Sequence, residues 1–150
     1  MTSSTFIAFD FGLKKMGVAI GQDITNMASP LDPIMMKDGI PDWRLLESVV
    51  DRYRPTIIIL GQPNLTGKSS ELLMEKIIVF KRILEERFSI TVEMEPEHLT
   101  TKEAKEKLKV QRQEGMLSRK IMKGQIDSMA ATIFLQDWMN QRLGDEHSSI

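Results

Sequence analysis

The sequence contains no cysteine, which excludes disulfide bonds, thiolate zinc sites and a cysteine nucleophile. Its two histidines, His98 and His147, lie too far apart and in contexts too different to predict a zinc site. No apolar run approaches the roughly 20 residues that are needed to span a bilayer. The N-terminal residues also lack the basic and apolar regions of an export signal. We therefore expect a cytoplasmic protein with no membrane segment.

Charge of one sign does not dominate either, because the net charge of the chain is only -1. No global basic field therefore indicates a polyanionic partner. The segment from Lys102 to Lys123 differs from the rest, with eight basic residues against three acidic ones, a local net charge of +5. Such a segment suits contact with phosphate groups. The alternative is a solvated helix with ion pairs four residues apart, such as Glu103 with Lys107.

The length and composition are those of one ordinary globular domain. The chain has 150 residues, of which 41% are hydrophobic and 27% charged, enough to bury a core. We expect a single domain over residues 1–150, with flexible tails at about 1–4 and 142–150.

The hydrophobic pattern predicts alternating strands and helices. Short runs rich in β-branched and aromatic residues, bounded by glycine or proline, are typical of strands, whereas apolar stripes three and four residues apart are typical of helices. Strands are predicted at 5–11, 16–22, 26–37, 56–60 and 90–94, and helices at about 43–52, 69–88, from 100, and 124–141. The order βββαβαβαα predicts an α/β fold, a mixed five-stranded sheet with helices on both faces.

Three acidic residues stand where a solvated charge is not expected. Asp10 interrupts a buried strand, in the segment FIAFDFG, where an uncompensated carboxylate would cost several kcal/mol. Glu97 follows the end of a predicted strand, and Asp127 lies near the start of a largely apolar helix, which places it toward the sheet. If the three converge at one edge of the sheet, their hard oxygen ligands suit Mg²⁺ or Mn²⁺.

Each acid taken alone also has a structural interpretation. Asp10 would then accept hydrogen bonds from the amides of the turn that follows it. Glu97 would be a surface residue, and Asp127 would be favoured by the dipole at the start of a helix. Only the combination of the three favours a functional site.

Several motifs together resemble the YqgF family, also called RuvX-like, which has an RNase H-like fold. The resemblance rests on the order and spacing of four blocks: Asp10-Phe11-Gly12 with Gly17-Val18-Ala19, Gly61-Gln62-Pro63, Glu97-His98-Leu99-Thr100-Thr101, and Lys123-Gly124-Gln125-Ile126-Asp127-Ser128. Members of this family are described as nucleases of pre-16S rRNA or as Holliday junction resolvases. The resemblance spans the chain from Phe6 to about Trp138.

The resemblance implies metal-dependent hydrolysis of phosphodiester bonds, with Asp10, Glu97 and Asp127 as catalytic residues and metal ligands. Two Mg²⁺ or Mn²⁺ ions would activate a water and stabilise the departing oxygen. Asp10 is the candidate for bridging both ions.

Four further residues are candidates for substrate binding: Lys14, His98, Lys120 and Lys123. Among them, His98 stands where the family commonly has arginine, and a histidine attracts phosphate by charge only while it is protonated. Gln62 is a second departure, because the family has an apolar residue at this place in the loop.

The resemblance favours processing of the 5′ end of pre-16S rRNA, with nucleic acid and ribosomal assembly intermediates as partners. Alternatives are a Holliday junction resolvase acting on branched DNA and a non-catalytic nucleic-acid-binding module. A monomer or a weak homodimer is expected. The Asp-Phe-Gly segment with Gly17 and Gly21 also resembles the first phosphate loop of actin-like ATPases, but those need two large lobes, and this chain has room for one.

Overall fold

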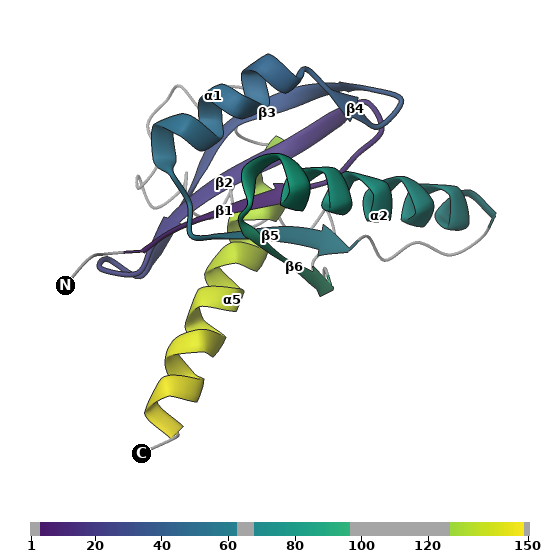
Figure 1. The fold of residues 1–150 in the computed structure, drawn as a ribbon. Helices are drawn as coiled ribbons and strands as arrows, with labels where there is room; N and C mark the ends of the chain where they lie inside the picture. Colours follow the sequence, from purple (N-terminus) through teal and green to yellow (C-terminus); the bar gives the residue numbers. More distant parts are fainter. Residues whose placement is uncertain (1–3, 63–67, 97–126, 149–150) are drawn as a thin grey trace, which may run out of the picture.

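The computed structural model describes residues 4–62, 68–96 and 127–148 (Figure 1). Six strands in these residues form one sheet in the order β4-β3-β2-β1-β5-β6. The elements are β1 (Thr5–Asp10), β2 (Lys15–Gln22), β3 (Met27–Lys37), β4 (Ile40–Pro41), α1 (Trp43–Tyr53), β5 (Ile57–Gln62), α2 (Lys68–Phe88), β6 (Thr91–Pro96) and α5 (Met129–Ser148).

Strand direction determines which residues meet at one edge of the sheet. Strands β1, β5 and β6 are parallel, so their carboxyl ends lie at the same edge. Strand β2 is antiparallel to β1, and its first residue, Lys15, therefore lies at that edge as well. In the register of the sheet, Asp10 is paired with Gly17 on one side and with Gly61 on the other, and Gly61 is paired with Glu95.

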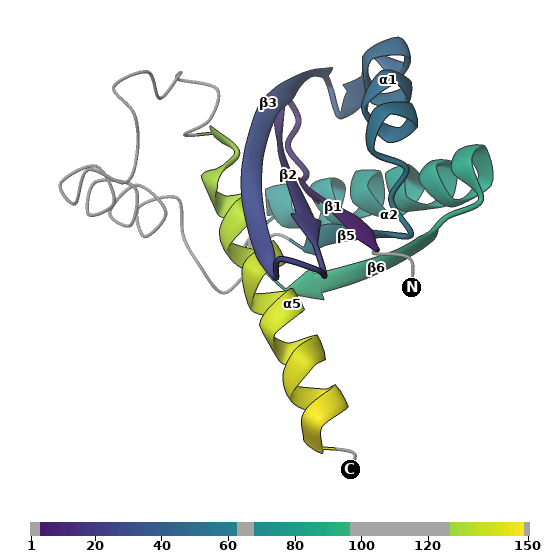
Figure 2. The same cartoon turned by 90° about the vertical axis from the view of Figure 1, so that its left-hand side faces the viewer.

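Helices cover both faces of the sheet, as the sequence predicts. Figure 2 shows α1 and α2 on one side and α5 on the other. Toward α1 and α2, alternate residues of β1 such as Ile7 and Phe9 join a buried cluster. The ring of Phe80 in α2 lies within this cluster, 5.2 Å from that of Phe11 and 5.9 Å from that of Trp43.

The opposite face of the sheet packs against α5. Here the other alternate residues of β1, Phe6 and Ala8, are buried against the apolar side of the helix. The rings of Phe6 and Trp138 meet edge to face, with centroids 5.0 Å apart. Asp10 follows Ala8 by two residues, so it belongs to the same face of β1 as Phe6 and Ala8.

The sheet has one strand more than the five that the sequence predicts. The additional strand, β4, pairs with the end of β3 through Lys37 and Ile40. Asp38 and Gly39 form the two-residue connection, with φ of 51° and 83°. Two successive residues with positive φ are the geometry of a type I′ hairpin turn, for which Asp-Gly is a preferred sequence. The dipeptide was therefore a usable signal for this hairpin.

Strand β3 continues through both of its prolines. The pairing of β2 with β3 shifts between Met16 and Val18, where Gly17 faces the two residues Asp32 and Pro33. This bulge accommodates Pro33, which has no N–H group for the ladder.

The helix boundaries differ from those predicted mainly at α5. The predicted helix at 124–141 is observed as Met129–Ser148 and so continues into the predicted C-terminal tail. The helix predicted from residue 100 lies outside the described residues. Helix α1 begins as predicted after Pro41, and the side chain of Asp42 caps it by accepting from the N–H of Arg44 at 3.1 Å. No helix in the described part of the chain is long and apolar enough to cross a membrane.

The start of α5 packs unusually closely against β2. A Cβ atom on Gly17 would lie 2.5 Å from the carbonyl oxygen of Asp127 and 3.1 Å from the Cα atom of Ser128. No real Cβ atom is found so close, so only glycine allows this approach. By contrast, a Cβ atom on Gly21 would meet only ends of side chains, the sulfur of Met139 at 2.5 Å and Cδ2 of Leu135 at 3.2 Å. The flexible end of Met139 can move, whereas the backbone of residues 127 and 128 cannot move without shifting the helix.

This contrast predicts different outcomes for two alanine substitutions in the same strand. We expect Gly17→Ala to lower the free energy of unfolding by about 1–3 kcal/mol, as overpacking against fixed atoms commonly does. Gly21→Ala should change it by less than about 1 kcal/mol, since rearrangement of Met139 is offset by the lower entropy of the unfolded chain. Urea unfolding of both variants measures these values. Equal destabilisation by the two substitutions would contradict the rigid contact at Gly17.

Candidate active site

Asp10 occupies the last position of β1, between two glycines. Residues directly opposite one another in adjacent strands extend their side chains from the same face of the sheet. Gly17 and Gly61 have no side chain, so neither neighbouring strand places a side chain beside Asp10, and on the Gly17 side the main chain at Asp127 occupies the space. The carboxylate is half-buried there. Asp10 thus lies at the sheet edge, on the face that α5 covers, with a glycine opposite it in each neighbouring strand.

Asp127 is brought to the same place by the packing of α5. Its main-chain carbonyl lies against Gly17, the residue that is paired with Asp10 in the sheet. Asp10 and Asp127, 117 positions apart in the sequence, are therefore both immediate neighbours of Gly17. The structure thus brings together two of the three predicted acids.

Ser128 fixes the main chain beside Asp127. Its side chain is fully buried, and its hydroxyl oxygen accepts a hydrogen bond from the N–H of Val18 at 3.0 Å. The bulge interrupts pairing with β3 next to Val18, and the hydroxyl satisfies this buried N–H group. Thr132 adds a second contact, donating from its hydroxyl to the carbonyl oxygen of Ser128 at 2.8 Å. The position of Asp127 is consequently set by its neighbour in the chain as well as by Gly17.

The carboxylate of Asp127 forms an ion pair with Lys15. Lys15 Nζ and Asp127 Oδ2 are 2.9 Å apart, and the two side chains are 36% and 31% exposed. Lys15 and Gly17 are two residues apart in β2 and so belong to the same face of the strand. Lys14 is the lysine of this turn that is predicted to bind substrate, and the neighbouring Lys15 is the one that contacts Asp127. Lys14 is exposed, and its main-chain carbonyl accepts from the N–H of Met36.

Alternation along β2 was the signal that could have distinguished the two lysines. Gly17 pairs with Asp10 in the hairpin, and only an odd-numbered neighbour in β2 shares its face. This reasoning selects Lys15, but it requires the register of the hairpin, which the sequence did not specify.

The remaining predicted site residues, Glu97, His98, Lys120 and Lys123, lie outside the described residues. Strand β6 ends at Pro96, the residue before Glu97, and it ends at the edge where Asp10 and Lys15 lie. In the described residues, no three His, Cys, Asp or Glu side chains are grouped so that they could hold a metal ion. A site with three acidic ligands would have to include a residue beyond these, such as the predicted Glu97.

The donor chemistry of the described residues fits a hard divalent cation. Carboxylate oxygens are the ligands that Mg²⁺ and Mn²⁺ prefer. Asp127 already attracts a cation in this structure, since the ammonium group of Lys15 lies against it. The half-exposed positions of Asp10 and Asp127 are compatible with access from solvent.

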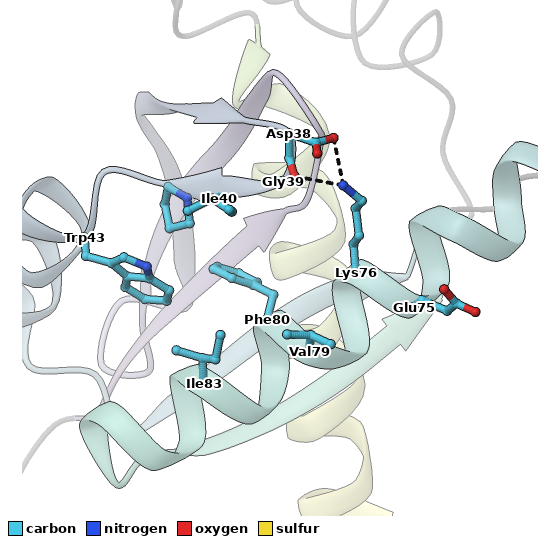
Figure 3. A pocket seen from close by; sticks show the side chains of 10 residues that line it. Asp38, Gly39, Ile40, Trp43, Glu75, Lys76, Val79, Phe80 and Ile83 are labelled. Atoms are coloured by element: carbon cyan, nitrogen blue, oxygen red, sulfur yellow. Dashed lines mark hydrogen bonds and ion pairs between the residues drawn. The ribbon is translucent and has the colours of Figure 1, made fainter.

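An apolar pocket lined by described residues lies elsewhere (Figure 3). Its volume is about 520 Å³, and its lining comes from the β3–β4 turn, the start of α1 and one side of α2. Trp43 and Phe80 belong to the cluster on the α1 and α2 face, opposite α5. Lys76 Nζ pairs with Asp38 Oδ1 at 2.7 Å at the rim. None of the predicted catalytic residues lines this pocket.

Solved structures with a similar fold include two resolvases. One is RuvC of T. thermophilus in complex with a Holliday junction substrate, with a TM-score of 0.59 and 18% identity over 94% of this chain and 96% of that chain. The other is the Fowlpox virus resolvase with Holliday junction DNA, with a TM-score of 0.52 and 16% identity over 90% of this chain and 98% of that one. These similarities confirm the predicted RNase H-like fold.

Sequence relatives extend over nearly the whole chain. A protein of Vibrio vulnificus (strain YJ016) named as a pre-16S rRNA nuclease is 38% identical over 95% of this chain and 99% of its own length. A relative from Saccharophagus degradans with the same name is 39% identical over 94% of this chain and 96% of its own length. The family described as "RuvX: Holliday junction resolvase" matches residues 4–141. The motifs, the fold and these matches agree, and the chain belongs to the RuvX family.

Proposed function

We propose that this protein is a nuclease that hydrolyses phosphodiester bonds in the precursor of 16S rRNA and requires Mg²⁺ or Mn²⁺. The observation that carries the proposal is the meeting of Asp10 and Asp127 around Gly17, at the sheet edge where β6 ends just before Glu97. The substrate is inferred from the relatives that carry the name of pre-16S rRNA nuclease. We propose that it acts in the cytoplasm on ribosomal assembly intermediates, as a monomer or weak homodimer.

Asp10, Glu97 and Asp127 are the residues that would hold the divalent cations. When bound, such cations activate a water for attack at phosphorus and stabilise the departing oxygen. Asp10 is positioned by the pairing of β1 with two strands, and the main chain at Asp127 by Ser128 and Gly17. The chain thus holds two carboxylates on rigid elements, which is what a preorganised site requires.

The basic segment from Lys102 to Lys123 would bind the nucleic-acid backbone. We propose that Lys120 and Lys123 contact phosphate groups, with Lys14 and His98 as further contacts. The segment ends four residues before Asp127, so its basic residues are close to this acid in the sequence. Phosphate contacts of this kind hold a substrate without reading its sequence.

Cleavage of four-way DNA junctions is the second candidate function. It is favoured by the description of the family and by the two similar structures that contain Holliday junctions. Symmetric cleavage of a junction requires two active sites related by a two-fold axis. Incubation with end-labelled rRNA precursors and with four-way junctions, alongside measurement of the mass of the complex, distinguishes the two candidates. Cleavage of junctions by a dimer, without cleavage of the RNA, would favour the second.

The acids at the site generate a direct prediction. We expect Asp10→Asn to lower the cleavage rate by more than about 100-fold, because even residues that only orient a metal ligand contribute 10–100-fold. The fold should persist, since Asp10 is half-buried at a strand end rather than in the core. Initial rates with Mg²⁺ or Mn²⁺ and melting curves in chelator measure both effects.

Asp51→Asn is the matched control for this substitution. Asp51 is exposed on α1, on the other side of the sheet, and the change of charge is the same. It should leave the rate within about twofold, as surface substitutions usually do. Full cleavage by Asp10→Asn, or equal cleavage with and without chelator, would contradict the proposed site. Binding of RNA without cleavage by the wild type would favour a non-catalytic binding module.

The basic segment predicts a dependence of binding on salt. Two phosphate contacts to single-stranded nucleic acid contribute about 1.4 to the slope of log K against log salt concentration. We therefore expect the double variant Lys120→Gln, Lys123→Gln to reduce the slope by about that amount. Filter binding or fluorescence anisotropy at several salt concentrations measures it. Lys76→Gln with Lys81→Gln, on α2, removes the same charge and should leave the slope unchanged. An unchanged slope in both variants would show that the segment is a solvated face.

A further inference from the structure

The ion pair between Lys15 and Asp127 connects the N-terminal hairpin with the C-terminal helix at the candidate site. The ammonium nitrogen lies 2.9 Å from Oδ2 of the carboxylate, although the residues are 112 positions apart. Lys15 is the first residue of β2, and Asp127 lies just before α5. The contact is therefore part of the junction between the helix and the sheet.

This pair differs from an ordinary pair of surface charges. Exposed ion pairs usually contribute little, because two long and mobile side chains must be held in one geometry. Here the aspartate has a short side chain, and the main chain around it is held by Gly17 and by the buried hydroxyl of Ser128. The two side chains are only about one-third exposed. The fold itself thus places an acceptor within reach of Lys15.

The ammonium group occupies a coordination position of an acid that the proposed function assigns to a metal ion. An ammonium group and a divalent cation compete for the same carboxylate oxygen, and they also repel each other at short range. A cation that binds through Oδ2 of Asp127 therefore competes with Lys15 for this oxygen. Because no such competition applies to a lysine that is not in contact with Asp127, the effect should be specific to this position.

We propose that Lys15 is a positioning residue that holds Asp127 in the cation-free protein and sets the affinity of the site for Mg²⁺ or Mn²⁺ by competing for Oδ2. The inference rests on the proposed function, because it requires a divalent cation to bind at Asp127. In the absence of the cation, the ammonium compensates a carboxylate that lies near Asp10. When the cation binds, the ion pair is exchanged for metal coordination.

The experiment is a calorimetric titration of Mn²⁺ into the wild type and three variants. Lys15→Met removes the charge and keeps the length of the side chain, whereas Lys15→Arg keeps a charge that can pair with Asp127. Lys14→Met is the matched control, since it removes the same charge from the adjacent, exposed lysine. We expect Lys15→Met to bind Mn²⁺ about threefold to tenfold more tightly than the wild type, from loss of a partly screened competitor. Lys15→Arg and Lys14→Met should stay within about twofold, because neither removes the competing contact.

A second measurement tests the pair without metal. In chelator, a double-mutant cycle of Lys15→Met and Asp127→Asn should show a coupling of about twofold to fivefold in the unfolding equilibrium constant, the usual range for partly exposed pairs. A cycle of Lys14→Met with Asp127→Asn should show no coupling above the error. Urea unfolding followed by circular dichroism provides both values and verifies that each variant folds.

The possible outcomes separate this inference from the proposed function. If the wild type binds Mn²⁺ and cleaves nucleic acid while Lys15→Met binds with unchanged or weaker affinity, the competition is wrong and the proposed function stands. If the wild type shows no saturable Mn²⁺ binding at millimolar concentrations, both are overturned. Tighter binding by Lys15→Met that Lys15→Arg reverses supports the exchange.

Discussion

The contact between the first residues of α5 and Gly17 of β2 is the constraint on which the site depends. It joins residues that are 110 positions apart in the sequence, and it leaves no room for a side chain at position 17. The hydroxyl of Ser128 completes the contact by satisfying the N–H of Val18 beside the bulge of β3. Since Gly17 is also the partner of Asp10 in the sheet, the close approach determines how near the two acids lie.

The two faces of the sheet have different roles. On the side of α1 and α2, residues of β1 and β5 pack into a large apolar cluster with several aromatic rings. On the other side, α5 packs against the sheet through a smaller cluster, whose small residues Ala8 and Ala19 let the helix approach closely. The polar residues of the site continue this second face to the edge. The apolar pocket on the first face is consequently separate from the acids.

Electrostatic compensation accounts for the charges at the sheet edge. Asp127 is partly shielded from water, and the structure supplies a cation, Lys15, rather than leaving the carboxylate to solvent alone. A carboxylate that is partly shielded from water attracts any cation strongly, and so it suits an ammonium group as well as the proposed divalent cation. Lys15 lies on the same face of β2 as Gly17, and it provides this compensating charge at Asp127.

The sequence by itself determined the fold class, the family and most element boundaries, because hydrophobic periodicity and the motif blocks are local properties of the chain. It indicated Asp10 and Asp127 as site residues from their unusual positions. Only the tertiary structure decided that Lys15, rather than Lys14, contacts Asp127, because this depends on hairpin register and on the distance between β2 and α5. Only the structure also showed that Ile40 and Pro41 pair with β3 as the extra strand β4, although the Asp38-Gly39 dipeptide is typical of such a hairpin turn. Contacts between distant segments are fixed by packing, which no local pattern specifies.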